Sequence, residues 1–478
     1  MHRMNGEDAG FLYMDLPGQP MNSQAVGILE PGPDGPITLA DLRRHLEDRL
    51  DQLPSFRWRV VRVPLRLHHP VYVPDPDFDL DFHLRIATVE QPGGDAELNA
   101  TFASIAERHL DQRHPLWQVT LVNGLAGGRQ AIIAKYQHCM ADGVAALTTF
   151  SRLYSDQDFP PLPGVPPWAP EPLPGRAALV AGALRDHARS AVGLPRLIRT
   201  TKRRTDAVKR RRADAETAVP GFSGQAPRCA FNDAFTPGRT YTRAALPLDG
   251  VKAVKDAAGV TVNDVVLAIL AGATRRYLDR HHELPAKPLL TSVPVSSEPA
   301  GAPVRQAGNR FWSFTTTLAT DVDDPLERLR TISATAQEAK AQLEVLGVDL
   351  MPAWLDVVPP LVAQPGARAL VDRLRDADAD DDVDGSILIS NIRGPSEPWT
   401  LFGRVVEDLY VDGPPSNGVG LNVMLWSYGP RLLFGVLAFA DALQHPESFS
   451  AAITEAYEEL SRAVASDAEA VGAGATTT

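Results

Sequence analysis

The chain has 478 residues, 47 basic and 59 acidic side chains, a formal charge of −12 and 44% apolar residues. This length predicts two to three domains, and the acidic balance argues against a nucleic-acid binder. The sequence contains no run of 18 apolar residues, so no membrane-spanning helix is predicted. Met1 to Asp15 lacks the apolar stretch of a signal peptide. Because only Cys139 and Cys229 are present, which fits a reducing compartment, we expect a cytoplasmic protein.

Residues 1–158 predict an N-terminal lobe that mixes helices and strands. Thr38 is a candidate N-cap ahead of an amphipathic pattern, and proline-bounded runs with strand composition follow it. The predicted helices cover 37–53, 98–110 and 144–154. The predicted strands cover 56–63, 68–73, 117–123 and 130–137, and the last two are expected to pair.

Residues 159–225 predict a crossover segment. Eight prolines fall between Phe159 and Pro174, a density that excludes a central strand or a continuous helix. A helical stretch follows, and it carries nine basic residues and one acid, Asp206, between Pro195 and Arg212. We name the segment from Pro195 to Arg212 the basic strip.

Residues 226–478 predict a second α/β lobe. The expected helices cover 248–258, a longer segment capped by Thr261, 324–343 and 446–464, and the expected strands cover 289–295, 311–318, 386–392, 421–426 and 432–439. Two such lobes joined by a crossover predict a cleft between them, which is a common place for a binding site.

The strongest local feature is the segment Tyr136 to Gly143, with the sequence YQHCMADG. An apolar strand leads into His138, and a helix begins near Asp142, so an imidazole lies at a strand end beside a turn. A histidine titrates near neutrality and can accept a proton as a general base. These residues alone also fit a buried, hydrogen-bonded His138 with Asp142 as a helix N-cap.

Other catalytic and cofactor signatures are absent from the sequence. It has no Gly-x-Ser-x-Gly nucleophile motif, no Walker loop and no dinucleotide-binding glycine pattern after a strand. The pairs His68-His69 and His281-His282 lack the carboxylates and the spacing of a zinc site. We therefore expect no metal ion and no bound cofactor.

Short blocks spread over nearly the whole chain form a family pattern together with Gln137, His138 and Asp142-Gly143. They are Phe11-Leu12-Tyr13 with Pro20-Met21, Pro115-Leu116-Trp117, Asn263-Asp264, Val293-Pro294-Val295-Ser296, Ser390-Asn391-Ile392-Arg393-Gly394-Pro395, and Gly418 to Asn422 with Ser427-Tyr428 and Phe434-Gly435. In this order they resemble the bacterial wax ester synthase/diacylglycerol acyltransferase (WS/DGAT) family, whose motif reads His-His-x-x-x-Asp-Gly.

The resemblance implies a fold similar to chloramphenicol acetyltransferase and to peptide-synthetase condensation domains, with two related α/β lobes around a tunnel. It implies that His138 is the general base, Asp142 its structural support and Gly143 the turn residue. It also implies that Gln137 and the pair Asn263-Asp264 lie near the cleft as substrate-binding candidates.

The activity implied by the resemblance is O-acyl transfer from a long-chain acyl-CoA to diacylglycerol, or to a fatty alcohol to give a wax ester. His138 would take the proton of the acceptor hydroxyl and later protonate the leaving thiolate. Acyl-CoA is a co-substrate here, so the reaction requires neither a metal nor a cofactor. Adjacent residues of an extended segment point to opposite faces, which predicts that Cys139 is packed and is not the nucleophile.

Two positions depart from the family pattern. Gln137 replaces the first His, and strand alternation points it away from the side that His138 faces, so we expect it to pack or to form hydrogen bonds. The family often has an arginine two residues after the Pro-Val-Ser block, where this chain has Glu298. If that arginine pairs with the motif aspartate, Asp142 needs another partner, which the sequence does not identify.

These departures leave alternatives open. The chain could acylate another lipid or use a carrier-bound donor, or it could be a weakly active or non-catalytic lipid-binding relative. We expect structural roles for the Pro-Leu-Trp, Pro-Val-Ser and Asn-x-x-Gly-Pro blocks, with Gly394 required for its backbone angles. The basic strip fits a solvated helix or a helix on an anionic surface; because the implied acceptors are lipids, we favour contact with the inner face of the plasma membrane or with lipid droplets.

Overall fold

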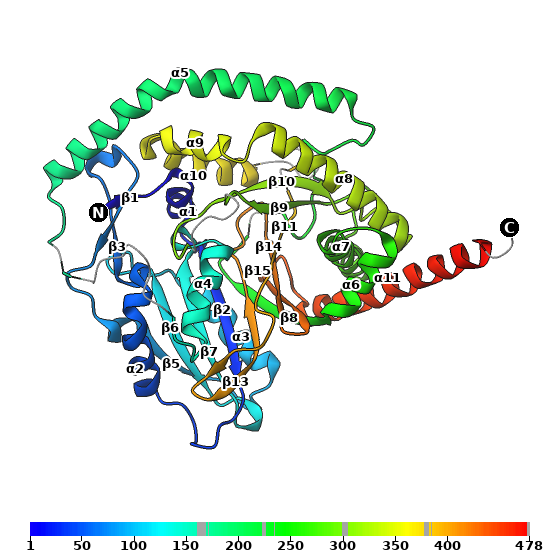
Figure 1. The fold of residues 1–478 in the computed structure, drawn as a ribbon, viewed down its shortest axis with the longest axis horizontal. Helices are drawn as coiled ribbons and strands as arrows, with labels where there is room; N and C mark the ends of the chain where they lie inside the picture. The colour runs from blue at the N-terminus through cyan, green and yellow to red at the C-terminus, as the bar shows by residue number, and fades with distance from the viewer. Residues whose placement is uncertain are drawn as a thin grey trace.

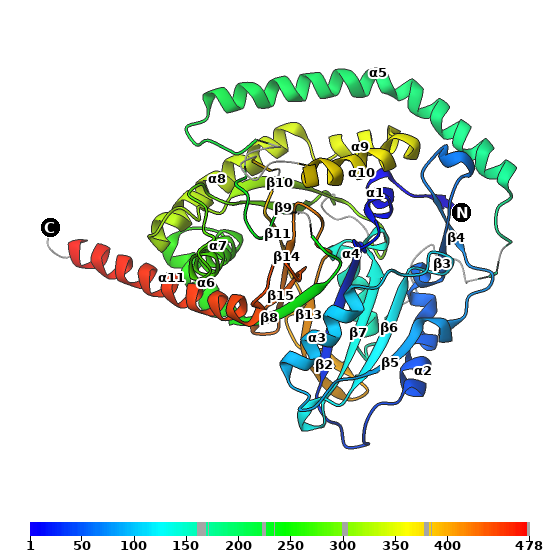
Figure 2. The same ribbon diagram turned by 180° about the vertical axis from the view of Figure 1, so that it is seen from behind.

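A computed structural model of the chain describes residues 1–159, 169–170, 172–221, 226–233, 235–298, 305–376, 382–383 and 385–475. These residues form two α/β lobes, each built around a six-stranded sheet (Figures 1 and 2). The predicted fold class is confirmed. Most of the predicted proline-rich crossover, residues 160–168 and 171, lies outside the described residues.

The N-terminal sheet takes strands from both ends of the chain. They are β2 (Asn22–Leu29), β5 (Leu84–Thr88), β6 (Trp117–Asn123), β7 (Gln130–Gln137), β12 (Thr400–Leu401) and β13 (Arg404–Val411). Their order is β12-β13-β2-β7-β6-β5, and only the β5–β6 pair is parallel. The division of the chain at residue 226 therefore does not coincide with the division between the sheets. Pairing with β13 satisfies the backbone groups of β2, which would otherwise form a sheet edge.

Shorter elements complete the N-terminal lobe. They are β1 (His2–Arg3), β3 (Trp58–Val61) and β4 (Val71–Pro74), which form a small sheet, and the helices α1 (Gly6–Met14), α2 (Leu39–Arg49), α3 (Asp95–Ala106) and α4 (Gly143–Leu153). Thr38 caps α2 in a capping box with Asp41, as the sequence predicts for Thr38.

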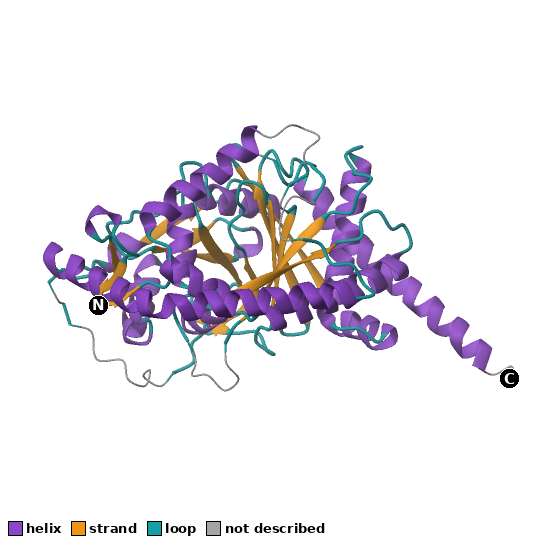
Figure 3. Ribbon diagram, turned by 90° about the horizontal axis from the view of Figure 1, so that it is seen from above, coloured by secondary structure: helices purple, strands orange, loops and turns teal. Residues whose placement is uncertain are grey.

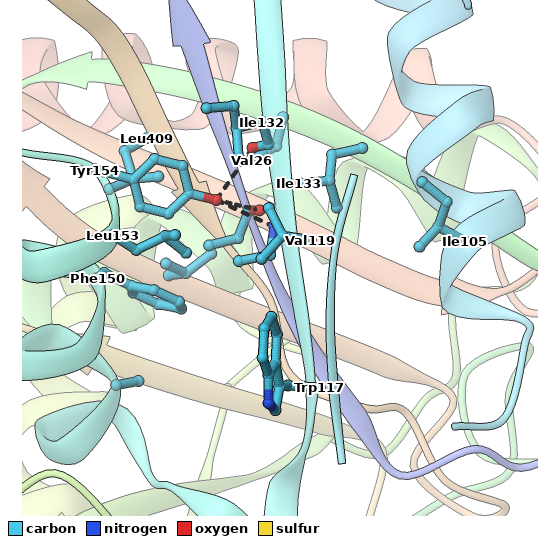
Figure 4. Packing of buried hydrophobic residues seen from close by; sticks show 14 of the residues in the cluster. Val26, Ile105, Trp117, Val119, Ile132, Ile133, Phe150, Leu153, Tyr154 and Leu409 are labelled. Carbon is cyan, nitrogen blue, oxygen red and sulfur yellow. Dashed lines mark hydrogen bonds between the residues drawn. The ribbon is translucent and has the colours of Figure 1, made fainter. Parts of the chain in front are cut away.

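Tyr154 fastens the end of α4 to the N-terminal sheet (Figure 4). Its buried hydroxyl accepts a hydrogen bond from the amide of Ala134 at 3.1 Å and lies 3.0 Å from the carbonyl oxygen of Ile132. A Cβ at Gly27 of β2 would lie 2.7 Å from the Tyr154 ring, so glycine allows the ring to reach the strands. This contact fixes α4, which begins at Gly143, the last residue of the predicted active-site segment.

The C-terminal sheet contains β8 (Arg239–Pro247), β9 (Leu290–Ser296), β10 (Phe311–Thr317), β11 (Ile387–Ile392), β14 (Leu421–Tyr428) and β15 (Arg431–Phe439). Their order is β10-β9-β11-β14-β15-β8. The helices of this lobe are α6 (Leu248–Ala258), α7 (Val262–Arg280), α8 (Pro325–Leu346) and α11 (Pro446–Ala475). Two further helices, α9 (Leu350–Val357) and α10 (Pro360–Asp376), pack against α1 of the N-terminal lobe. α7 is buried along most of its length and packs against α6, α8 and α11.

A single long helix, α5 (Arg176–Asp214), runs along one side of both lobes (Figures 1 and 3). Arg3 pairs with Asp186 at 3.1 Å on the N-terminal lobe, and Arg211 pairs with Glu338 at 2.7 Å on the C-terminal lobe. Among the described residues no single helix is long and apolar enough to cross a membrane, and one pair, α6 with α7, passes this test together while bent by 104°.

Candidate active site

His138 lies where the two lobes meet. It directly follows β7, and its ring stacks on Phe11 of α1, with ring centres 4.1 Å apart and an interplanar angle of 1°. The ring of Phe311, from β10 of the other sheet, is centred 6.3 Å away. Within the described part of the chain, Nδ1 of His138 is buried without a hydrogen-bond partner, and the side chain lines a cavity between the lobes.

The surroundings of His138 favour the neutral imidazole. Burial lowers the pKa of His138 below its ordinary value of 6.5, while its own backbone carbonyl and the Asp142 carboxylate act in the opposite direction. The side chain is therefore unprotonated near pH 7, which is the form that a general base requires.

A cavity of about 340 Å³ lies beside His138 between the lobes. Its volume falls within the range of about 300–1,000 Å³ that is typical of small-molecule sites. Most of its lining is apolar, with a few convergent polar groups. The N-terminal lobe contributes Phe11, Met14, Met21, His138, Asp142, Gly143 and Val144, and the later chain contributes Pro294, Ser296, Phe311, Leu388, Ser390, Asn391, Ile392, Arg393, Gly413, Pro414, Ser416, Asn422 and Met424.

Asp142 holds the turn after His138 in two ways. Its Oδ1 accepts hydrogen bonds from the amides of Val144 at 3.1 Å and Ala145 at 3.0 Å, so it is the N-cap of α4. Its Oδ2 accepts from the amide of Arg310 at 2.8 Å and from the guanidinium of Arg305 at 2.6 Å. Asp142 therefore supports the turn structurally and joins it to the segment before β10.

Arg305 is the partner of Asp142 that the sequence did not identify. The same guanidinium also contacts Glu298 and the backbone carbonyl of Gly308. An isolated β-bridge joins Gly308 to Ala141, the residue before Asp142. The side chain of Arg305 is 13% exposed and that of Asp142 is 7% exposed, so the ion pair is largely withdrawn from water. Arg305 comes seven residues after Glu298 in the sequence, and only its contacts in the folded chain show that it reaches the motif.

Two acidic side chains of α1 were also missed by sequence reasoning. Asp8 accepts hydrogen bonds from the amide of Asn309 at 2.7 Å and from its side chain at 2.8 Å, and the same Asn309 side chain donates to the carbonyl of His138 at 2.9 Å. Burial raises the pKa of Asp8 to about 7 and that of Glu7 to about 8. These contacts link α1, the His138 turn and the segment before β10.

Close packing explains why glycine occupies positions 143 and 394 of the family motifs. Neither Gly143 nor Gly394 has a positive φ. A Cβ at Gly143 would lie 2.0 Å from Cδ1 of Ile392, and a Cβ at Gly394 would lie 2.2 Å from the carbonyl oxygen of Ser427. Glycine is needed at both places because neighbouring elements approach closely, and neither place requires a positive φ.

Gln137 lies beside the site and does not line the cavity. Its Oε1 accepts from the amide of Cys139 at 2.5 Å, and its Nε2 donates to the carbonyl of Phe11 at 3.1 Å. It therefore positions the turn and α1 by hydrogen bonds, as strand alternation predicts, and its role in substrate binding stays a prediction. Cys139 is fully buried, and burial raises the pKa of its thiol, which fits a packed cysteine.

Asn263 and Asp264 do not line this cavity. Asp264 forms a capping box with Thr261 at the start of α7 and accepts a hydrogen bond from Ser333 at 3.1 Å. α7 is a core helix of the C-terminal lobe, and the expectation that this pair lies near the cleft and binds substrate stays a prediction.

The other family blocks divide between packing and cavity lining. Trp117 is buried, stacks on Phe56 at 4.3 Å and donates to its carbonyl at 2.7 Å, which confirms a packing role. The Pro-Val-Ser and Asn-x-x-Gly-Pro blocks were expected to be structural, yet their residues Ser296 and Asn391 line the cavity with His138. Among the described residues no group of three or more His, Cys, Asp or Glu side chains could hold a metal ion.

Comparison with known proteins places these features in a family. The wax ester synthase/diacylglycerol acyltransferase catalytic domain matches residues 4–266, and the C-terminal domain of the same family matches residues 307–461. Two Mycobacterium tuberculosis proteins, each bearing the name "putative diacyglycerol O-acyltransferase", are 35% and 33% identical to this chain. The first alignment covers 97% of this chain and 96% of the relative, and the second covers 96% and 97%.

Solved structures of related proteins support the same family assignment. A wax ester synthase/diacylglycerol acyltransferase from Marinobacter aquaeolei VT8 is similar with a TM-score of 0.66 and 25% identity, over 97% of this chain and 100% of that one. The first condensation domain of the CDA synthetase shares the fold with a TM-score of 0.55 and 15% identity, over 97% and 96% of the two chains. This chain therefore belongs to the wax ester synthase/diacylglycerol acyltransferase family and is an acyltransferase.

Proposed function

We propose that this protein forms triacylglycerol from diacylglycerol and a long-chain acyl-CoA, with His138 as the general base. The observation that carries the proposal is the position of His138: its neutral imidazole lies on the wall of an apolar cavity between the lobes. The mycobacterial relatives carry the diacylglycerol acyltransferase name, and the family includes wax ester synthases.

The proposed reaction needs one base and no covalent enzyme intermediate. Nε2 of His138 takes the proton of the acceptor hydroxyl while its oxygen attacks the thioester carbonyl. The tetrahedral oxyanion then collapses, the C–S bond breaks, and the imidazolium gives its proton to the thiolate, which leaves as free CoA. Polar side chains on the cavity wall, such as Ser390 and Asn391, are candidate donors to the oxyanion. Acyl-CoA serves as co-substrate, and no metal or cofactor takes part.

A fatty alcohol is the second candidate acceptor, because the same base can act on any primary hydroxyl that enters an apolar cavity. Purified protein incubated with palmitoyl-CoA and equal amounts of diacylglycerol and hexadecanol separates the two, with products identified by mass spectrometry. We expect triacylglycerol in amounts equal to the CoA released. Wax ester alone would transfer the proposal to the fatty alcohol, and CoA release without either ester would refute both.

The pH dependence should report the lowered pKa of His138. Because only the neutral imidazole is a base, kcat/KM should fall as the pH drops through that pKa, so the midpoint of the acidic limb should lie below 6.5. Phe11→Ala uncovers the ring and removes part of the desolvation, which should move the midpoint upward toward 6.5. Initial rates across pH 4.5–8 for both proteins test this, and a midpoint that Phe11→Ala leaves in place contradicts it.

We also propose that α5 carries the protein to a lipid surface. Its described residues expose the large apolar side chains of Leu184, Val192 and Ile198 beside basic residues of the strip. Not all of the strip is available: Arg204 pairs with Asp349 and Arg211 with Glu338 on the C-terminal lobe. Within the described part of the helix, six further basic residues of the strip are exposed and form no such ion pair: Arg196, Arg199, Lys202, Arg203, Lys209 and Arg210.

A matched pair of variants tests this contact. Lys202→Gln/Arg203→Gln removes two outward charges, and each basic residue near an anionic surface contributes about 1 kcal/mol, so binding to phosphatidylglycerol vesicles should weaken about 30-fold. Arg204→Gln/Arg211→Gln removes the same charge from the paired positions and should weaken it much less. Vesicle co-sedimentation measures both, and equal affinities for the two variants would count against a lipid-facing α5.

A further inference from the structure

A second cavity lies on the opposite side of α1 from His138 and is rich in arginine. Its volume is about 360 Å³, and it lies between α1, the segment that joins β3 to β4, and the start of α10. We name it the arginine cavity. Its lining residues are Leu12, Tyr13, Asp15, Leu16, Arg62, Val63, Arg66, His68, Pro70, Pro360, Gln364 and Arg368.

The arginine cavity has an excess of positive charge. Among the described residues, Arg62, Arg66 and Arg368 form no ion pair with an acidic side chain, and Arg62 donates only to the neutral Gln112, at 2.5 Å. The one lining carboxylate, Asp15, is engaged by Nδ1 of His109 at 2.5 Å. Three guanidinium groups thus face a cavity without anionic partners of their own, and guanidinium groups match phosphate oxygens in geometry.

A buried neutral donor also lines the arginine cavity. His68 is 7% exposed, and its Nδ1 accepts a hydrogen bond from the amide of His69 at 2.7 Å. The proton of the neutral ring is therefore on Nε2, which has no acceptor within the described part of the chain. Pro360, the first residue of α10, lines the same cavity, so the partial positive charge of that helix start adds to the guanidinium groups.

The backbone beside the arginine cavity is held in an unusual conformation. Leu65 and Arg66 have φ values of 56° and 54°, the left-handed region that non-glycine residues rarely adopt. Leu65 is 79% exposed, so packing of its side chain does not explain the conformation. Strained residues of this kind cluster at ligand-binding sites, and here the strained segment presents Arg66 to the cavity.

We propose that the arginine cavity binds a phosphate ester. Leu12, Tyr13 and Leu16 of the α1 segment line this cavity, while Phe11 and Met14 of the same helix line the cavity of His138. An occupant therefore touches the helix whose Phe11 stacks on the base. The nucleotide part of acyl-CoA and a phospholipid headgroup both carry phosphate esters. Assignment to acyl-CoA rests on the proposed function, whereas phosphate recognition does not.

Calorimetric titration of the full chain tests the proposal without any turnover. The background is His138→Ala, so a missing acyl transfer cannot be confused with missing binding. The probes are adenosine 3′,5′-bisphosphate for the nucleotide of acyl-CoA, sn-glycerol 3-phosphate for a lipid headgroup, and inorganic phosphate. The test variant is Arg66→Gln/Arg368→Gln. The matched control is Arg44→Gln/Arg330→Gln, which removes two exposed arginines elsewhere on the surface.

Each hydrogen bond to a charged group contributes enough to change affinity about tenfold to a hundredfold, so the test variant should bind at least a hundredfold more weakly while the control binds as the parent does. Loss confined to adenosine 3′,5′-bisphosphate assigns the cavity to acyl-CoA, and loss confined to glycerol phosphate assigns it to a lipid headgroup. Loss for inorganic phosphate alone would overturn the phosphate ester and leave a free-phosphate site. Equal affinities of the test variant and control for every probe, or no binding to the parent, would overturn the proposal.

Discussion

Replacing His138 by alanine is expected to lower kcat for acyl transfer by about 10²- to 10⁴-fold, because a positioned general base contributes a factor of that size. The side chain lies on the cavity wall, so its removal deletes the base. The hydrogen bonds of Asp142 and Gln137 still hold the neighbouring turn in the variant. Free CoA measured with a thiol reagent gives kcat, and the melting temperature confirms that the variant is folded.

Cys139→Ala is the matched control for His138→Ala. Cys139 is the next residue in the chain, fully buried, with a thiol whose pKa is raised by burial. A buried, protonated thiol is a poor nucleophile, so we expect this variant to keep its rate within a few fold. The reverse pattern, with activity lost in Cys139→Ala and kept in His138→Ala, would replace base catalysis by a thiol mechanism.

Local patterns predicted the elements whose structure depends on local sequence. The bounds of β6, β7 and α6 agree with the predicted ranges, because alternation, amphipathic spacing and a following Gly259 define them within a few residues. The segments α9 and α10 were missed, since Pro352, Pro359, Pro360 and Pro365 interrupt the pattern on which a helix prediction depends.

Pairings between distant segments could not be predicted in this way. β13 joins β2 across more than 370 residues of chain, and no local signal in either strand specifies the other. The same limit applies to the site. The motif around His138 is contiguous and was found, whereas Phe11, which stacks on the ring, and Asn309, which holds its carbonyl, approach it only in the folded protein.

The link between the lobes at the site depends on Arg305. Replacing Arg305 by alanine leaves the Asp142 carboxylate, 7% exposed, with backbone amides as its only remaining donors among the described residues. Loss of one partner from such a buried pair should lower the free energy of unfolding by about 2–3 kcal/mol. Because Asp142 fixes the turn that carries His138, we also expect kcat to fall at least tenfold. Urea denaturation and CoA-release kinetics measure the two effects.

A charge swap tests whether the pairing itself matters. The family resemblance places an arginine at position 298, where this chain has Glu298, and Arg305 contacts both Glu298 and Asp142. Arg305→Glu alone should be worse than Arg305→Ala, because it adds a third carboxylate beside Asp142. Glu298→Arg/Arg305→Glu returns one arginine and one glutamate to the same cluster and should restore most of the stability and rate. If the double variant instead loses the sum of its two single losses, the residues act independently and Arg305 is not the substitute for the family arginine.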